Sequence, residues 1–313
     1  MRNAFAAEIT ALAAQDPRVV LLSGDIGNRL FDSFKERHPD RFFNCGIAEA
    51  NMVSVAAGLA LCGLRPVTYT IASFMTTRCF EQIRVDACYH HLPLVIVGVG
   101  AGLAYAANGG THHACEDIAI LRVLPGMTVV CPADAEEVRL AVRAALACRG
   151  PVYLRLGKKG ERPVHAAPPA FRLGEGIVLR RGTDVCLLGT GNMVAVAQEV
   201  ADRLAAAGRS AEVVSLHTVK PLDDALLTRV CADFPLVATL EEHSILGGLG
   251  GSVAEWMADR SRVRAKLLRF GTPDRYVHEA GDQEYVRELF GLTAERIGAR
   301  ILAERSPEGR RTA

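Results

Sequence analysis

The sequence has almost no excess charge and few aromatic side chains. Its 313 residues include 36 lysines and arginines against 35 aspartates and glutamates, and Phe, Trp and Tyr together make up 6%. Proteins that bind nucleic acids or anionic membranes depend on clustered positive charge, and single-stranded nucleic acids stack on aromatic rings. The composition therefore predicts neither a nucleic-acid partner nor a membrane partner.

Long apolar runs and closely paired cysteines are also missing. The most apolar stretch, 92–103, is short and is interrupted by three glycines, which excludes a membrane span. None of the nine cysteines belongs to a Cys-x-x-Cys pair, which favours reduced, buried thiols. The first residues place Phe5, Ile9 and Leu12 on one helical face and show no leader-like apolar core. We therefore expect a cytoplasmic protein.

Length and hydrophobic pattern indicate two α/β domains. At about 150 residues per domain, the chain has room for two. Short continuous apolar runs, typical of strands buried on both faces of a parallel sheet, alternate with helix-length segments in both halves. The proline-containing segment 161–172 interrupts this alternation and is predicted to be a linker between domains 1–160 and 173–305, with a flexible tail at 306–313. Strands are predicted at 19–22, 66–71, 94–99, 127–130, 152–156, 184–188, 211–216, 236–240 and 265–270, and helices near 49–62, 74–91, 134–148, 192–207, 222–232, 247–260, 282–290 and 293–304.

A single acidic residue opens the predicted helix 49–62. Glu49 is followed by apolar helical turns and preceded by Ile47 and Ala48. Acidic side chains favour helix N-termini because of the unpaired N–H groups and the helix dipole, which is one explanation for its position. A carboxylate in apolar surroundings is also suited to share a proton with a ligand nitrogen. The residues alone leave both interpretations open.

Three further polar segments follow predicted strands. Residues 23–28 (SGDIGN) end the first strand, residues 74–78 (FMTTR) follow the second, and residues 108–113 (NGGTHH) follow the third. Ligands gather at the carboxyl ends of the strands in α/β sheets. We therefore expect the three segments to converge on Glu49.

Taken in order, these blocks resemble the C-terminal half of transketolase and of 1-deoxyxylulose-5-phosphate synthase, and more closely the small subunit of split, two-chain transketolase-like enzymes. The resemblance extends from about residue 3 to about residue 304. It implies an α/β fold of two domains: a pyrimidine-binding thiamine diphosphate domain with a parallel sheet, and a transketolase C-terminal-like domain. The matching blocks are GDIGN (24–28), GIAEANMVSVAAGLA (46–60), ASFMTTRCFEQIRVD (72–86), GGTHHACEDIAILRVLPGMTVVCPAD (109–134), HTVKPLD (217–223) and EEHSILGGLGGSVAE (241–255).

The resemblance implies a set of cofactor contacts. Glu49 would be a catalytic residue that hydrogen-bonds the aminopyrimidine ring nitrogen of thiamine diphosphate and so activates the cofactor. Phe74 would stack on the pyrimidine ring, with Met75 as the alternative because the alignment can shift by one residue. Asp25 and Arg78 would border the same cofactor.

The resemblance also implies substrate contacts. His112 would be the second catalytic residue, facing the donor near its reacting carbon, where an imidazole can hydrogen-bond a hydroxyl and move its proton. Arg155 matches a position that binds phosphate or another anion. Asn28, Asn108 and His113 complete the predicted substrate ligands; Asn108 replaces the aspartate common in the family, which leaves the identity of the donor open.

The metal-binding motif of this superfamily is absent from the chain. Thiamine diphosphate is bound together with Mg²⁺, and the resemblance assigns the oxygen ligands of that ion to a Gly-Asp-Gly motif followed by Asn. Neither 24–27 nor 281–283 matches that motif. We therefore predict no metal ligand in this chain, and a second subunit that carries the motif, in an α₂β₂ assembly.

The predicted reaction is the transfer of a two-carbon ketol unit from a sugar or other 2-oxo donor to an aldehyde acceptor. Two alternatives remain open. One is the β subunit of a 2-oxo acid dehydrogenase E1 component, and the other is a non-catalytic partner subunit.

Overall fold

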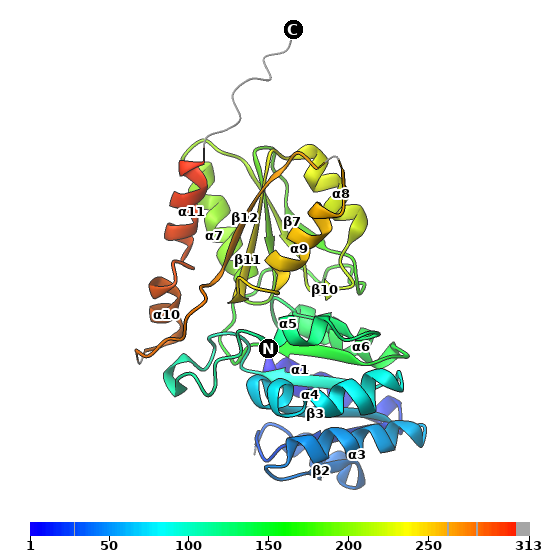
Figure 1. Ribbon diagram of the computed structural model, residues 1–313. Helices are drawn as coiled ribbons and strands as arrows, with labels where there is room; N and C mark the ends of the chain where they lie inside the picture. Colours follow the sequence, from blue (N-terminus) through cyan, green and yellow to red (C-terminus); the bar gives the residue numbers. More distant parts are fainter. Residues whose placement is uncertain (28, 262, 280, 305–313) are drawn as a thin grey trace.

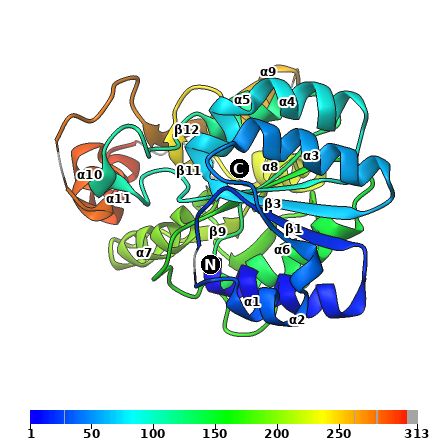
Figure 2. The same ribbon diagram turned by 90° about the horizontal axis from the view of Figure 1, so that it is seen from below.

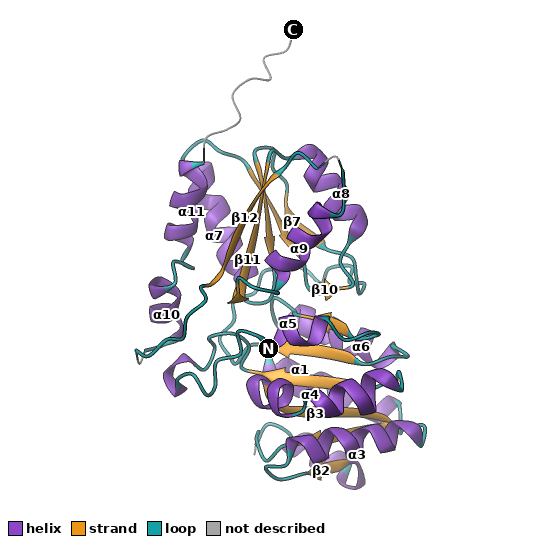
Figure 3. Ribbon diagram, viewed as in Figure 1, coloured by secondary structure: helices purple, strands orange, loops and turns teal. Residues whose placement is uncertain are grey.

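The computed structural model describes residues 1–27, 29–261, 263–279 and 281–304, so the predictions for Asn28 and for the tail 306–313 lie outside the described residues. Two α/β domains, each built around one sheet, confirm the predicted fold class (Figure 1 and Figure 3). Within the described residues all nine cysteines are free. No helix in this part of the chain has both the length and the apolar character needed to cross a bilayer.

The first domain contains a seven-stranded sheet. Its strands are β1 (Val19–Ser23), β2 (Phe42–Asn44), β3 (Arg65–Ile71), β4 (Val95–Val99), β5 (Thr128–Val130), β6 (Val152–Leu156) and β10 (Thr218–Lys220). They lie in the order β10-β5-β6-β4-β3-β1-β2. All neighbours from β5 to β2 are parallel, as the continuous apolar runs predict. The edge strand β10 is antiparallel to β5 and comes from the second half of the chain.

Helices cover both faces of this sheet (Figure 2). One face carries α1 (Arg2–Gln15), α2 (Asp32–Arg37) and α6 (Ala135–Ala147), with the short helix η1 (Pro39–Arg41) beside them. The other face carries α3 (Glu49–Leu61), η2 (Phe74–Arg78), α4 (Phe80–Gln82), η3 (Ile83–Tyr89) and α5 (Asp117–Arg122). The single helix predicted at 74–91 is thus interrupted, because η2 and η3 are π-helical, a wide turn that is frequent at functional sites.

The second domain contains a five-stranded sheet. Its strands are β7 (Ile177–Arg180), β8 (Val185–Gly189), β9 (Ala211–Ser215), β11 (Leu236–Ser244) and β12 (Lys266–Thr272), in the order β12-β11-β8-β9-β7, with β7 antiparallel to β9. Helices α7 (Met193–Ala206) and α11 (Ala294–Ala303) pack on one face, and α8 (Asp224–Asp233) and α9 (Leu249–Ala258) on the other. Helix α10 (Gln283–Leu289) lies toward the first domain (Figure 1).

The junction between the domains is a continuous piece of structure. The N–H of Cys131, just after β5, donates to the carbonyl of His217, just before β10 (2.6 Å). Lys220 Nζ donates to the carbonyls of Arg122 and Leu124 at 2.8 and 2.5 Å. One apolar cluster includes core residues of both domains. The described residues 157–176, which include the predicted linker, form no helix or strand.

Candidate active site

The three predicted polar segments converge at one edge of the first sheet. Strands β4, β3 and β1 are neighbours and parallel, so their carboxyl ends lie side by side. The N–H of Gly24, after β1, donates to the carbonyl of Tyr69 in β3 at 3.1 Å. Ser73 Oγ, after β3, donates to the carbonyl of Thr111 in the loop that follows β4 (3.2 Å). These contacts bring the segments together as the strand-end argument predicts.

Glu49 lies at the start of α3 and is almost completely buried, with 4% of its surface exposed. Its carboxylate accepts hydrogen bonds from Arg78 Nη1 at 3.2 and 3.3 Å. The Arg78 side chain is 48% exposed, so the ion pair lies at the boundary between the interior and the solvent. Among the described residues no other donor reaches this carboxylate, which leaves hydrogen-bonding capacity for a ligand.

An unpaired hydroxyl and a glycine adjoin Glu49. Thr70 Oγ1 is buried and has no hydrogen-bond partner among the described residues. A Cβ atom at Gly24 would lie 3.0 Å from Thr70 Oγ1 and 3.6 Å from Glu49 Cγ. Buried polar groups in native proteins are normally hydrogen-bonded. The unsatisfied hydroxyl and the buried carboxylate fit a ligand that carries polar ring atoms, and the glycine lets the chain after β1 pack closely against Thr70.

The two stacking candidates point in different directions. Phe74 is half-buried, with the Arg78 guanidinium 3.9 Å from its ring centroid and the His112 ring at 5.2 Å. Met75 is fully buried in the apolar core, where its Sδ lies 4.0 Å from Thr68 Oγ1. Because Met75 is enclosed in the core, its side chain offers no exposed surface on which a ligand ring could stack.

His112 lies on the loop after β4 and is half-buried. Its Nδ1 is 2.9 Å from Thr111 Oγ1, and its ring centroid is 6.1 Å from that of Tyr105. Burial, and then the positive charges of His113 and Arg78, lower the pKa of His112 below the ordinary value of 6.5. The imidazole is therefore neutral at pH 7 and can donate a hydrogen bond from one nitrogen and accept one at the other.

Sequence reasoning missed two residues beside His112. Lys158 Nζ lies 4.7 Å from the centroid of the Tyr105 ring, which in turn faces His112. Lys158 is two residues beyond the carboxyl end of β6, at the same edge of the sheet as the other segments. That position after a buried strand was the signal that could have identified it. Lys158 thus places a positive charge close to Tyr105 and His112.

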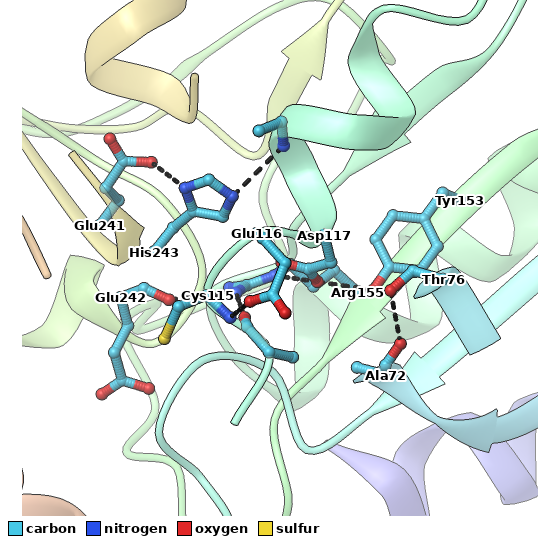
Figure 4. A network of polar contacts seen from close by, with 12 residues as sticks. Ala72, Thr76, Cys115, Glu116, Asp117, Tyr153, Arg155, Glu241, Glu242 and His243 are labelled. Carbon is cyan, nitrogen blue, oxygen red and sulfur yellow. Dashed lines mark hydrogen bonds and ion pairs between the residues drawn. The ribbon is translucent and has the colours of Figure 1, made fainter. Parts of the chain in front are cut away.

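Arg155 lies at the junction between the two domains. Its side chain is 3% exposed, and its Nε donates to Asp117 at 2.7 Å. Its Nη2 donates to the carbonyls of Ala114 and Glu242 at 2.7 and 3.0 Å, within the polar network shown in Figure 4. Burial acts to raise the pKa of Asp117, but the charge and hydrogen bond of Arg155 outweigh it and lower that pKa. Arg155 is thus held at the domain junction by buried contacts of its Nε and Nη2, and its contact with a substrate anion stays a prediction.

The remaining predicted residues lie at the rim. Asp25 is exposed, adopts a left-handed backbone conformation (φ 56°) and accepts a hydrogen bond from Asn44 Nδ2 at 2.8 Å. Asn108 is exposed at the end of the short helix η4 (Ala106–Asn108). His113 Nε2 lies 3.4 Å from the carbonyl of Ala106. In the described part of the chain, no group of three or more His, Cys, Asp or Glu residues is arranged to hold a metal ion.

Two family models match most of the chain. The family model for the transketolase pyrimidine-binding domain matches residues 1–162, and that for the transketolase C-terminal domain matches residues 174–297. The chain is 38% identical to the 6-deoxy-6-sulfo-D-fructose transketolase subunit SqwH of Clostridium sp. (strain MSTE9), over 95% of this chain and 92% of that protein. It is 34% identical to a putative transketolase C-terminal section of Methanocaldococcus jannaschii, over 98% and 97%.

Longer proteins and solved structures extend the comparison. The 1-deoxy-D-xylulose-5-phosphate synthase of Chlorobium luteolum is 36% identical over 95% of this chain, which spans 47% of that protein. A solved structure described as "Split gene transketolase, inactive beta4 tetramer" superposes with a TM-score of 0.87 at 38% identity, covering 96% of both chains. Transketolase from Campylobacter jejuni shares the fold (TM-score 0.81, 19% identity, 97% of this chain and 46% of that one). The chain therefore belongs to the transketolase family, whose pyrimidine-binding and C-terminal domains it carries in that order.

Proposed function

We propose that this chain is the small subunit of a two-chain transketolase-like enzyme that transfers a two-carbon ketol unit from a ketose donor to an aldehyde acceptor with thiamine diphosphate. The observation that carries the proposal is a continuous series of contacts at the carboxyl edge of the first sheet. It runs from Glu49 through Arg78 and Phe74 to His112, and joins a buried acid, an aromatic face and a neutral imidazole.

The residues around Glu49 fit the aminopyrimidine end of the cofactor. Glu49 would hold a proton at the ring nitrogen, Phe74 would offer the aromatic face, and Arg78 and Asp25 would border the ring. The unpaired Thr70 hydroxyl, close to Glu49, supports this placement. When bound, thiamine diphosphate supplies an acidic carbon that bonds to the donor carbonyl. A fixed carboxylate that is shielded from water is suited to move a proton at the cofactor ring.

His112 and Lys158 would contact the donor. The neutral imidazole of His112 can exchange a proton with a donor hydroxyl, since one nitrogen donates and the other accepts. Asn108 and His113 would lie further along the sugar. Because Nε and Nη2 of Arg155 are already engaged, we propose Lys158 as a further contact for a terminal anion beside the predicted Arg155. The name of the Clostridium relative specifies a sugar with a sulfo group at its sixth carbon, which supports an anionic donor.

A second subunit would complete the site. The Gly-Asp-Gly…Asn motif is absent from this sequence, so we assign the diphosphate contacts and the Mg²⁺ ligands to the partner, in an α₂β₂ assembly. The solved relative described as an inactive tetramer of β chains supports a chain that needs a partner for activity.

Co-expression with the partner subunit tests the proposal. The complex should form ketol products from hydroxypyruvate or ketose donors with a panel of aldehydes, whereas the chain alone should form none. Glu49→Gln should reduce both turnover and exchange of the cofactor's C2 proton by at least about a hundredfold, because proton transfer at the ring is lost. Glu81→Gln, which changes an exposed glutamate of α4, is the matched control and should retain activity.

The alternatives predict other outcomes. Decarboxylation of a 2-oxo acid without ketol product from any donor would favour the dehydrogenase E1 component. Normal C2-proton exchange in the Glu49→Gln complex would refute the assigned role of Glu49. Full activity of the partner subunit in the absence of this chain would favour a non-catalytic role.

A further inference from the structure

The loop between Gly102 and Ala114 carries three of the predicted substrate ligands, Asn108, His112 and His113. At its base the two backbones pair: the N–H of Gly102 donates to the carbonyl of Ala114 (3.1 Å), and the N–H of Ala114 to the carbonyl of Gly102 (2.9 Å). Residues 103–113, called here the donor loop, include Tyr105 and His112. The position of His112 therefore depends on how firmly this base is held.

A glutamate of the second domain holds one end of the base. Glu242, in β11, is 1% exposed, and its Oε2 accepts a hydrogen bond from the N–H of Leu103 at 2.8 Å. The Glu242 carbonyl accepts from Arg155 Nη2 at 3.0 Å, and the same nitrogen donates to the carbonyl of Ala114 at 2.7 Å. Both ends of the donor loop are thus tied to one residue of the other domain, directly at Leu103 and through Arg155 at Ala114. Figure 4 shows Glu242 beside Arg155.

The Glu242 carboxylate is itself immobilised. Arg287 Nε donates to it at 2.6 Å and Gln283 Nε2 at 2.9 Å, both from α10, and Asn192 Nδ2 donates at 3.2 Å. Burial acts to raise the pKa of Glu242, but Arg287 and the hydrogen bonds outweigh it and lower that pKa. A charged carboxylate with this many donors has little freedom to move.

The packing between the loop base and Glu242 leaves no space for an additional side chain. Gly102 has a φ of 58°, a conformation that L side chains rarely adopt. A Cβ there would lie 2.5 Å from the Glu242 carbonyl oxygen and 2.6 Å from its Oε2. The base of the loop is therefore seated directly on the glutamate.

We propose that Glu242 is a positioning residue of the C-terminal domain. By holding the base of the donor loop, it fixes where His112 stands relative to Phe74 and Glu49, without itself contacting cofactor or substrate. Through Glu242 the second domain would contribute to the geometry of a site whose proposed residues in this chain all lie on the first domain. The effect on loop order stands on its own, whereas the consequence for activity rests on the proposed function.

Hydrogen–deuterium exchange of the full chain tests the proposal without any catalytic assay. Glu242→Gln weakens the hold on Leu103, so amides of 103–113 should exchange at least about tenfold faster. Outside this segment and α10, whose Arg287 also loses its counter-charge, both domains should keep their protection. Glu212→Gln is the matched control. It removes the charge of another buried glutamate of the same domain, whose partners are Arg229 and Arg181, and should leave 103–113 unchanged.

Three results would overturn the proposal: unchanged exchange at 103–113 in Glu242→Gln, an equal acceleration in Glu212→Gln, or acceleration spread evenly over the chain. If Glu242→Gln does not fold, hydrogen–deuterium exchange of the Gln283→Ala variant tests the proposal instead. It removes one donor to Glu242 from a partly exposed side chain and should accelerate exchange in the same segment by a smaller factor.

A second experiment measures the activity of the complex with the partner subunit. Glu242→Gln should lower kcat/KM for the donor by about tenfold or more, while exchange of the cofactor's C2 proton stays at the wild-type rate. Loss of C2-proton exchange in this variant would contradict a role confined to the loop. If the wild-type complex forms no ketol product, the proposed function fails, but the exchange result still decides whether Glu242 positions the loop.

Discussion

Replacing Asp117 with asparagine removes one charge from a deeply buried ion pair at the domain junction. Asp117 Oδ2 accepts hydrogen bonds from Arg155 Nε and from the Tyr153 hydroxyl, both at 2.7 Å. The side chains of Asp117 and Arg155 are 1% and 3% exposed. Asparagine has nearly the same size and keeps one acceptor oxygen, but it leaves the guanidinium without a counter-charge in the interior.

The expected cost follows from this burial. Breaking a buried ion pair by removing one partner costs about 3–5 kcal/mol. For a protein of this size each kcal/mol lowers Tm by about 2–4 °C, so a fall of roughly 6–20 °C is expected. The exposed pair Arg180–Asp202 provides the control, because its aspartate is 75% exposed. Asp202→Asn should cost no more than about 1 kcal/mol.

Thermal unfolding of both variants between pH 3 and pH 7, followed by circular dichroism, measures these differences. Because the folded-state pKa of Asp117 lies below 3.8, its contribution is present above that value and is lost as the pH falls through the folded pKa. The difference between wild type and Asp117→Asn should therefore be constant from pH 5 to pH 7 and shrink at lower pH. A loss at pH 7 no larger than that of Asp202→Asn would refute the structural role of the Arg155–Asp117 pair.

Two further predictions concern single residues of the site and the domain junction. In steady-state kinetics, Lys158→Ala should raise KM for a donor with a terminal anion by about tenfold and leave KM for an uncharged analogue unchanged. Lys159→Ala, which changes an exposed neighbour, is the control. Equal effects of the two variants would contradict the assignment of Lys158. Burial lowers the pKa of His243 to about 4, so the neutral side chain stabilises the fold fully above pH 6.5. This contribution is lost as the pH falls from 6.5 toward 4. In thermal melts, His243→Gln should therefore show a flatter Tm profile than the wild type over that range, and parallel profiles would contradict it.

The sequence predicted the elements whose apolar pattern is continuous. Most predicted strands and helices agree with the structure to within about two residues, whereas β2, β7, β10, α2 and α5 were missed. Strand β2 is short and mostly exposed, and β7 is short and half-buried, so neither shows a buried run. β10 pairs with a strand of the other domain, which local pattern cannot reveal. β11 extends four residues beyond its prediction because Glu241–Ser244 are polar and mostly buried.

The candidate site was predictable as a location but not in its side-chain directions. The carboxyl ends of neighbouring parallel strands brought Glu49, Phe74 and His112 together as expected. Whether Met75 or Phe74 faces outward depends on the π-helical turn, and a regular helical period does not describe that turn. Arg155 is enclosed because Asp117 and the second domain surround it, which only the tertiary structure shows.

The antiparallel pairing of β10 with β5 has a consequence for how the chain can be divided. Thr218 and Lys220 pair with Val130 and Val129, so the outermost strand of the first sheet is supplied from beyond the linker. If the chain were cut at 161–172, β5 would become an open edge with unpaired N–H and C=O groups. Such an edge is a template for pairing with a strand of another molecule, which leads to aggregation. Separate family models match the regions on either side of the linker. We nevertheless expect the first region to aggregate when it is produced without the second.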